Sequence, residues 1–252
     1  MVAPVEVDMS ELLTDVLYLT RADWGADTSL PRKGYTQDRN GVDIYLRKTE
    51  ADIHHSVVID SDPTPDIWET LEEIKKKSKR MQTIRPDLGN DWPYNHGVYL
   101  MPGTAICIAE GRGYNRTGAH TKGHNTIGWG LVFMGNFHAG PRVNLDPWLP
   151  AINRYLAHVK STELPNLIDI KSHRRITQED NRPYTACPGD DIVIKIPRFS
   201  LEEDDMSQEL DSRMKQSSVL ALIAAKALAG AKITNEEKAI AIGVINALAV
   251  TD

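Results

Sequence analysis

The stretch IGWGLVFMGNF, Ile127 to Phe137, decides the fold that the sequence predicts. It is a continuous apolar run, which is typical of a central strand buried on both faces. Upstream, the segments GVYLMP and TAICIAEG flank Pro102-Gly103 and predict two strands joined by a tight hairpin. Cys107 lies in the middle of the second strand, where a free cysteine is usually a small buried apolar residue. The sequence therefore predicts a domain built around a buried sheet.

Strand and helix patterns alternate around this apolar run. DIHHSVVI, Asp52 to Ile59, is rich in β-branched residues and predicts another strand. One helix is expected to begin near Asp66, which can cap it with Glu69 three residues on. A second is expected at Asp146-Pro147, a capping residue followed by a first-turn proline. Apolar residues at helical spacing predict the buried faces, which are Ile67, Leu71, Ile74 and Met81 in the first helix and Trp148, Ile152, Tyr155 and Val159 in the second.

A different, purely helical composition follows Pro197, and we place a domain boundary in the acidic segment LEEDD at residues 201–205. This gives a main domain over residues 1–200, with its core at about 20–195, and a C-terminal α-helical segment over residues 201–252. Two Ala- and Leu-rich helices are expected there, separated by Gly230. Such helices are too apolar to stay in water, and the segment carries five basic against nine acidic residues. We therefore expect an assembly or targeting role, and because the acidic balance disfavours adhesion to an anionic wall polymer, it favours self-association into a homo-oligomer.

Composition excludes several functional classes. The 252 residues are 41% hydrophobic and 25% charged, as in ordinary globular proteins. The net charge of -6 provides no basic surface for nucleic acid. With two cysteines there is no disulfide framework. The N-terminus carries acids where a secretory signal has lysines, and the most apolar later stretch, Val219 to Ala231, is too short to span a membrane.

Eight histidines and Cys187 make metal binding the first chemistry to consider. Zinc takes imidazole and thiolate ligands, and a catalytic zinc site uses three protein ligands. His54 and His55 are neighbours in the predicted strand, so only one of them can face a given site, and spacing does not decide which. Cys187 follows His173 and precedes Pro188-Gly189 in a loop, where a structural cysteine is less expected. A thiol nucleophile is a second interpretation of the same residues.

Seven motifs follow one another between about residues 20 and 195. They are RADWGA (Arg21 to Ala26), IHHS (Ile53 to Ser56), PYNHGVYL (Pro93 to Leu100), AEGRG (Ala109 to Gly113), GAHTKGHNTIGWGLVFMGNF (Gly118 to Phe137), SHRR (Ser172 to Arg175) and TACPGD (Thr185 to Asp190). In this order they resemble the zinc amidases that share their fold with the peptidoglycan recognition proteins, a group that includes many phage endolysins. The resemblance implies an α/β fold, in which a mixed central β-sheet is flanked by helices.

The same resemblance implies an activity and its residues. The activity is that of an N-acetylmuramoyl-L-alanine amidase, which uses zinc to hydrolyse the amide bond between N-acetylmuramic acid and L-alanine in bacterial peptidoglycan. By position, His54, His173 and Cys187 match the zinc ligands. Tyr94 and Thr185 match donors to the oxyanion that develops during hydrolysis.

Three more residues, Arg112, His120 and Asn125, match groove residues that contact the glycan and the peptide. Two features depart from the family pattern. Arg175 stands where the family often has an aspartate, which weakens any argument that this position supports His173. The loop from His173 to Cys187 is longer than in compact members, so the substrate preference stays open.

Two interpretations from other classes compete with the amidase. A non-catalytic peptidoglycan-binding module would keep the groove and lose the cysteine ligand, and Cys187 argues against it. A virion-associated wall anchor would use the C-terminal helices for assembly. Because no export signal is visible, we expect a phage endolysin that stays in the host cytoplasm until it is released onto the cell wall. A bacterial amidase that recycles imported wall fragments is the alternative.

Overall fold

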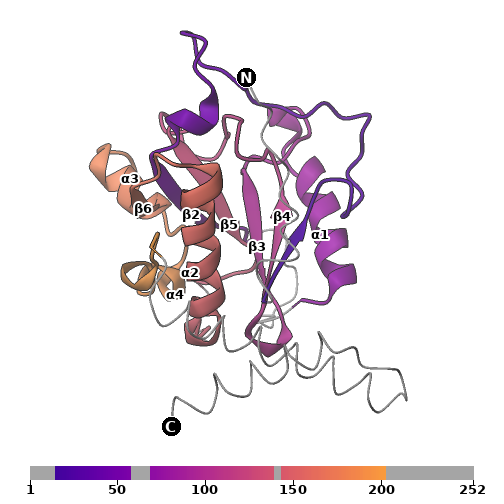
Figure 1. Cartoon of the computed structure of the whole chain (residues 1–252), viewed down its shortest axis with the longest axis vertical. Coiled ribbons are helices and arrows are strands. Elements are labelled where there is room, and N and C mark those ends of the chain that lie inside the picture. The colour runs from indigo at the N-terminus through magenta and orange to yellow at the C-terminus, as the bar shows by residue number, and fades with distance from the viewer. Residues whose placement is uncertain (1–14, 58–68, 139–142, 203–252) are drawn as a thin grey trace, which may run out of the picture. The chain divides into compact units, whose positions relative to one another are not determined.

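A six-stranded mixed sheet forms the centre of the described part of the chain, which in this computed structural model comprises residues 15–57, 69–138 and 143–202. The strands lie in the order β1-β4-β3-β5-β2-β6 (Figure 1). Neighbouring strands are parallel, except that β3 and β4 are antiparallel. The strands are β1 (Val16–Leu19), β2 (Glu50–His55), β3 (His96–Leu100), β4 (Ile106–Glu110), β5 (Gly128–Phe133) and β6 (Asp169–Ser172).

The position of β5 explains why its sequence is apolar throughout. β5 lies between β3 and β2, and all six of its residues are buried. Trp129 and Leu131 belong to one apolar cluster, whereas Val132 belongs to a second cluster on the opposite face. The predicted central strand is confirmed. The predicted hairpin is confirmed as well, because β3 and β4 pair from Leu100 and Ile106 outward.

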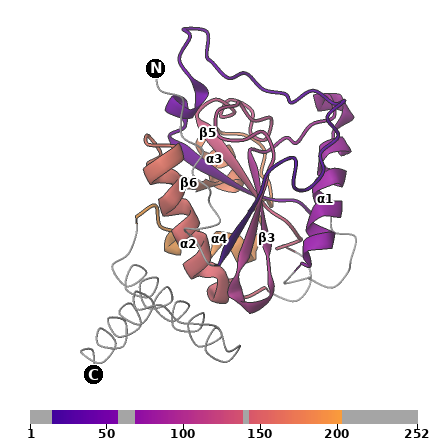
Figure 2. The same ribbon diagram turned by 45° about the vertical axis from the view of Figure 1, so that its right-hand side comes forward.

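The two longest helices in the described residues cover opposite faces of the sheet, and Figure 2 shows the strands between them. α2 (Leu149–His158) shares the first apolar cluster with Ile53 of β2. α1 (Leu71–Thr83) shares the second cluster with Cys107 of β4. The α/β class with a mixed, helix-flanked sheet is confirmed. The shorter helical segments are α3 (His173–Glu179), α4 (Asp190–Val193), the π-helical η6 (Val159–Glu163) and the 3-10 segments η2 (Ile44–Arg47), η3 (Pro86–Leu88), η4 (Pro102–Thr104), η5 (Asp146–Trp148) and η7 (Ile196–Arg198).

α1 begins later than predicted. Its N-cap is Thr70, whose side chain accepts a hydrogen bond from the Glu73 backbone, while the Glu73 carboxylate accepts one from the Thr70 backbone. The expected cap, Asp66, lies outside the described residues. Leu71 is 43% exposed, because the stripe that faces the sheet starts one turn later at Ile74. The prediction that Leu71 belongs to the buried face is therefore wrong.

α2 has the predicted apolar face but not the predicted cap. Ile152 and Tyr155 of α2 are buried, and so are Trp148 at the end of η5 and Val159 at the start of η6. Asp146 lies inside η5, whose N-cap is Leu145. The Asp146 carboxylate pairs with Lys195 at 2.6 Å instead of capping the helix. An ion pair to a distant segment thus replaces the expected local contact.

The predicted strand over residues 52–59 is shifted toward the N-terminus. β2 ends at His55, and Val57 has a φ of 45°, which takes the backbone out of the extended conformation. The predicted C-terminal helices, their self-association and the division of the chain at residue 201 concern residues outside the described ones, so they stay predictions. Within the described residues, no helix is long and apolar enough to cross a membrane.

Candidate metal centre

One part of one sheet face carries ionisable side chains. Successive residues of β2 point to opposite faces, and Ala51 and Ile53 belong to the apolar cluster shared with α2. Glu50, Asp52 and His54 therefore point to the other face. All three are buried. Buried ionisable groups need partners: Glu50 pairs with Lys171 of β6 at 3.1 Å and with His124, and Asp52 faces His120 at 3.5 Å.

Three residues from distant parts of the chain meet at this face. His54 comes from β2, His173 is the first residue of α3, and Cys187 lies in the loop before α4. His54 Nδ1 lies 3.6 Å from Cys187 Sγ, and the ring centroids of His54 and His173 are 4.7 Å apart. One ligand atom from each of the three lies within 4.8 Å of the other two. The fold therefore brings the predicted ligand trio to a spacing that one metal ion can bridge.

Local hydrogen bonds hold the loop of Cys187 next to the start of α3, where His173 lies. Arg174 N donates to Cys187 O at 2.9 Å, and Cys187 N donates to Thr185 Oγ1 at 3.2 Å. Ser172 caps α3 by accepting a hydrogen bond from Arg175 N at 3.0 Å. The loop of Cys187 is thus tied to the start of the helix that begins with His173.

The donor atoms suit zinc. Burial, together with the neighbouring His120 and His173, holds the pKa of His54 well below its usual value. Burial and Arg182 also lower the pKa of His173. Both imidazoles are therefore neutral at pH 7, and neutral imidazole is the form that binds a metal. Two imidazole nitrogens and one thiolate form a ligand set that zinc prefers.

The thiol of Cys187 does not have the properties of an activated nucleophile. Burial raises its pKa to about 12. A nucleophilic cysteine needs a lowered pKa, because the thiolate is the reactive form. A bound dication would favour that thiolate as a ligand. The environment of Cys187 thus favours the metal-ligand interpretation over the thiol-nucleophile interpretation.

The side chain of His55 points to the face of β2 opposite that of His54. His55 pairs in register with Phe133, and its Nδ1 accepts a hydrogen bond from Phe137 N at 3.4 Å. Burial lowers its pKa to about 4. The structure therefore places the side chain of His54, and not that of His55, beside His173 and Cys187, while the His55 backbone hydrogen-bonds the Cys187 thiol.

Tyr94 and Thr185 lie beside the ligands. The ring centroid of Tyr94 is 5.0 Å from that of His54. Burial, with the Cys187 thiol nearby, raises the pKa of the Tyr94 hydroxyl, so this group keeps its proton and can donate a hydrogen bond. Thr185 Oγ1 already accepts from Cys187 N, which leaves its own proton to be donated elsewhere. Their roles as oxyanion donors stay predictions.

Arg112 and His120, two of the predicted groove residues, have buried side chains, and their contact with substrate stays a prediction. Arg112 is 4% exposed, and its guanidinium donates to the carbonyls of Trp92 at 2.6 Å and Thr117 at 3.1 Å. The side chain of His120 is fully buried. Both side chains brace the segment around residues 111–126 from inside. Asn125 has a similar task, because its Oδ1 accepts from the backbone nitrogen of His120 at 2.8 Å, and its contact with substrate stays a prediction.

The stretch between His173 and Cys187, expected as one long loop, begins with α3 and continues as the long loop over residues 180–187. Arg182 pairs with Asp180 at 3.1 Å and donates to the carbonyl of Lys122. Asp180 also contacts His124 Nε2 at 3.3 Å. These contacts join the long loop to the loop over residues 118–126. Arg175, the departure from the family pattern, pairs with Glu179 on the surface at 2.8 Å.

Two buried residues of the site were missed in the sequence. Thr121 Oγ1 lies 3.2 Å from His54 Nε2, and Asp52 points to the same face of β2 as His54. The alternation of Glu50, Asp52 and His54 in a buried strand was an available signal, because carboxylates are seldom fully buried unless they are paired. No local pattern could have paired Thr121 with a residue 67 positions away.

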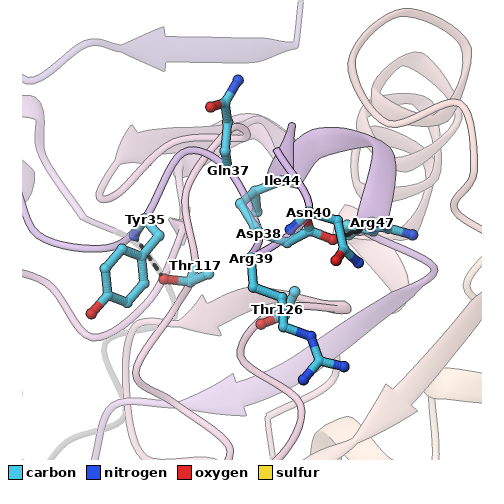
Figure 3. A pocket seen from close by; sticks show the side chains of 9 residues that line it. All are labelled: Tyr35, Gln37, Asp38, Arg39, Asn40, Ile44, Arg47, Thr117 and Thr126. Atoms are coloured by element: carbon cyan, nitrogen blue, oxygen red, sulfur yellow. Dashed lines mark hydrogen bonds and ion pairs between the residues drawn. The ribbon is translucent and has the colours of Figure 1, made fainter. Parts of the chain in front are cut away.

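A separate hollow of about 720 Å³ lies along the segment between β1 and β2 (Figure 3). Tyr35 N donates to Thr117 Oγ1 at 3.0 Å, and Arg47 pairs with Asp38 at 2.6 Å. The described residues that line this hollow do not include the ligand trio. They are Tyr35, Gln37, Asp38, Arg39, Asn40, Ile44, Arg47, Thr117 and Thr126.

Known proteins resemble this chain in sequence and in fold. No protein-family model matches it. A segment of 110 residues, 42% of the chain, is 30% identical to a Sus scrofa protein named N-acetylmuramoyl-L-alanine amidase. The segment covers 17% of that protein, so the chain spans about a sixth of the relative's length.

Two solved structures show the fold. Drosophila PGRP-LB is 22% identical with a TM-score of 0.55, and the match covers 75% of this chain and 99% of that one. Peptidoglycan recognition protein-LE, solved in complex with tracheal cytotoxin (monomeric diaminopimelic acid-type peptidoglycan), is 20% identical with a TM-score of 0.52. That match covers 77% of this chain and 99% of that one. The chain therefore has the fold of the peptidoglycan recognition proteins.

Proposed function

We propose that this protein is a zinc-dependent N-acetylmuramoyl-L-alanine amidase. It would hydrolyse the amide bond between N-acetylmuramic acid and L-alanine in bacterial peptidoglycan. The observation that carries the proposal is the meeting of His54, His173 and Cys187 within 4.8 Å on a fold shared with peptidoglycan recognition proteins. The amidase name of the partial sequence relative supports the same reaction.

The residues of the site have distinct tasks in this reaction. His54, His173 and Cys187 would hold the zinc. When bound, zinc acts as a Lewis acid that polarises a carbonyl and lowers the pKa of water. The Tyr94 hydroxyl, which keeps its proton, would donate a hydrogen bond to the carbonyl oxygen as negative charge develops on it. Thr185 would be a second donor. Its oxygen already accepts a hydrogen bond from Cys187 N, so its hydroxyl proton is left to be donated to the substrate.

Peptidoglycan is the proposed partner. One protein of the same fold was solved with tracheal cytotoxin, a monomeric form of peptidoglycan. A phage lysin released onto the host wall is the proposed biological setting, and its support is the sequence resemblance to phage endolysins alone.

Defined muropeptides with mass spectrometry test the proposal. The full-length protein, loaded with zinc and freed of excess metal, is expected to release a stem peptide with a free N-terminal alanine and a glycan with a free lactyl carboxylate. One zinc per chain is expected by elemental analysis. Cys187→Ser is the matched control, because it removes one ligand atom and keeps the side-chain size.

The outcomes separate the alternatives. Binding of muropeptides without cleavage by the zinc-loaded protein would identify a non-catalytic binding module. Cleavage at another bond would overturn the assignment of the reaction. Cleavage by a protein without zinc would overturn the role of the metal.

A further inference from the structure

A buried chain of polar contacts runs from His54 into the protein. His54 Nε2 lies 3.2 Å from Thr121 Oγ1, and Thr121 Oγ1 lies 3.1 Å from His120 Nδ1. His120 Nδ1 in turn lies 3.5 Å from Asp52 Oδ2. Thr121 is 1% exposed, and the side chains of His120 and Asp52 are not exposed at all. The chain is therefore shielded from water along its length.

We infer that Thr121 is a positioning residue, whose hydroxyl fixes the tautomer and the ring orientation of His54 for metal binding. The inference rests on the proposed metal site. His54 Nδ1 faces Cys187 Sγ at 3.6 Å, so Nδ1 must be unprotonated to bind a metal. The ring proton of neutral His54 must then lie on Nε2. Thr121 Oγ1 is within hydrogen-bonding distance of that nitrogen and accepts from it.

Two backbone hydrogen bonds hold Thr121 in place. Asn125 Oδ1 accepts from the backbone nitrogen of His120 at 2.8 Å and from that of Thr121 at 3.1 Å. Asn125 thereby fixes the two consecutive residues whose side chains contact each other. The hydroxyl of Thr121 is thus presented to His54 by a loop that is already ordered.

Two glycines hold the ring of His120. A Cβ at Gly118 or at Gly130 would overlap the edge of this ring, so the ring lies between two stretches of bare backbone. Its Nδ1 faces Thr121 and Asp52. The His120 ring is therefore a fixed neighbour of the Thr121 hydroxyl, on the side of the hydroxyl that faces away from His54. A ligating histidine whose second nitrogen is held in this way binds its metal more tightly, and loss of the partner typically costs about 10- to 100-fold in metal affinity.

The test is the zinc affinity of the full-length protein, measured by competition with a chromophoric chelator. Thr121→Val keeps the shape of the side chain and removes the hydroxyl, and we expect a loss of affinity of about 10- to 100-fold. Thr121→Ser restores the hydroxyl and should stay within about 3-fold of the wild type. Thr177→Val is the matched control, because Thr177 is 6% exposed and its hydroxyl bonds a backbone carbonyl, that of Arg174.

A second readout reports the tautomer directly. In 15N-labelled, zinc-loaded wild type, the Nε2 proton of His54 should be visible by NMR and slow to exchange with water. In Thr121→Val this proton should exchange quickly. A residue that only fills space would leave the signal unchanged, so this readout separates positioning from packing.

Each outcome decides one point. Wild-type affinity and a slowly exchanging proton in Thr121→Val would overturn the inference and leave the proposed function intact. A wild type that binds no zinc would overturn both. If Thr121→Val does not fold, Thr121→Ala removes the same hydroxyl with a smaller side chain, and wild-type affinity there overturns the inference equally.

Discussion

One face of the sheet has two parts, of which one is covered by a helix and the other by loops. Over β1, β4 and β3, α1 covers an apolar surface that includes Tyr99, Cys107 and Ala109. Over β2 and β5, two loops cover the ionisable residues Asp52 and His54. Both parts are buried to a similar degree. Burial therefore does not distinguish the candidate site from the core, and the difference lies in the neighbours of each side chain.

The two cysteines make this contrast concrete. Burial raises the pKa of both Cys107 and Cys187 to about 12. Cys107 lies in a strand and belongs to an apolar cluster. Cys187 has the Nδ1 of His54 at 3.6 Å. A raised thiol pKa alone therefore does not indicate a metal site. A thiol that lies beside two neutral imidazoles does indicate a candidate metal site.

The largest expected effect is the loss of zinc on substitution of one cysteine and not the other. Cys187→Ser should fold but lose nearly all bound zinc, because a hydroxyl is a poor zinc ligand compared with a thiolate. Cys107→Ser should keep one zinc per chain and lose about 1–3 kcal/mol of unfolding free energy, because it buries a hydroxyl among apolar groups. Elemental analysis after dialysis and urea unfolding measure the two effects. Equal zinc contents in the two variants would contradict the assignment of the metal site to the ionisable part of the sheet face.

Two tyrosines give the next largest effect. Tyr94→Phe should keep zinc and stability and lose on the order of 100-fold in turnover, as expected when one oxyanion donor is removed. Tyr99→Phe removes the hydroxyl that contacts Ser78 Oγ at 2.9 Å in the apolar part. It should leave turnover unchanged and lower the unfolding free energy by about 1 kcal/mol. Steady-state kinetics on a soluble muropeptide decide this, and near-normal turnover of Tyr94→Phe would assign Tyr94 to packing.

Two glycines test the space around the site. A Cβ at Gly130 would overlap His120, and a Cβ at Gly97 would meet the Trp92 ring at 2.9 Å. Alanine at either position should lower the unfolding free energy by about 1–3 kcal/mol through overpacking. Only Gly130→Ala should also weaken zinc binding, because His120 contacts Thr121. Chelator competition on both variants checks this, and equal zinc affinities would contradict it.

The sequence predicts the fold best where a single pattern dominates. β5 and the buried face of α2 follow from apolar runs and helical spacing. The start of α1 does not, because Asp66 with Glu69 and Thr70 with Glu73 are both capping pairs in the sequence. Nothing local chooses between two such pairs. The observed start at Leu71 is therefore a product of the whole fold.

The site shows the same limit. The motifs identified His54, His173 and Cys187, which the structure brings together. The motifs also pointed to Arg112 and His120, whose side chains are buried and brace a loop. A motif marks a residue as important without showing where its side chain points. Direction comes from long-range contacts, which one sequence does not reveal.

The smallest expected effect concerns the charge balance of the ionisable part. Lys48 is fully buried, and its Nζ donates to the carbonyls of Asn125 at 3.1 Å and Gly128 at 2.5 Å. Burial lowers its pKa to about 7, although the nearby Asp52 acts in the opposite direction. In the unfolded chain the pKa of lysine is about 10.4. Between these two values the unfolded state holds one more proton than the folded state, so the contribution of Lys48 to stability rises with pH.

Lys48→Met removes this titration and keeps most of the side-chain volume. From pH 7 to pH 9, the unfolding free energy of the wild type should rise relative to Lys48→Met by about 1 kcal/mol per pH unit. Taking the difference between the two proteins cancels the titration of all groups that they share, including the two buried thiols. Urea unfolding at pH 7, 8 and 9 measures it. Parallel pH profiles would mean that Lys48 stays protonated in the folded protein. The negative charge of Asp52 would then balance the buried charge of Lys48, and Lys48 would not lose its proton on folding.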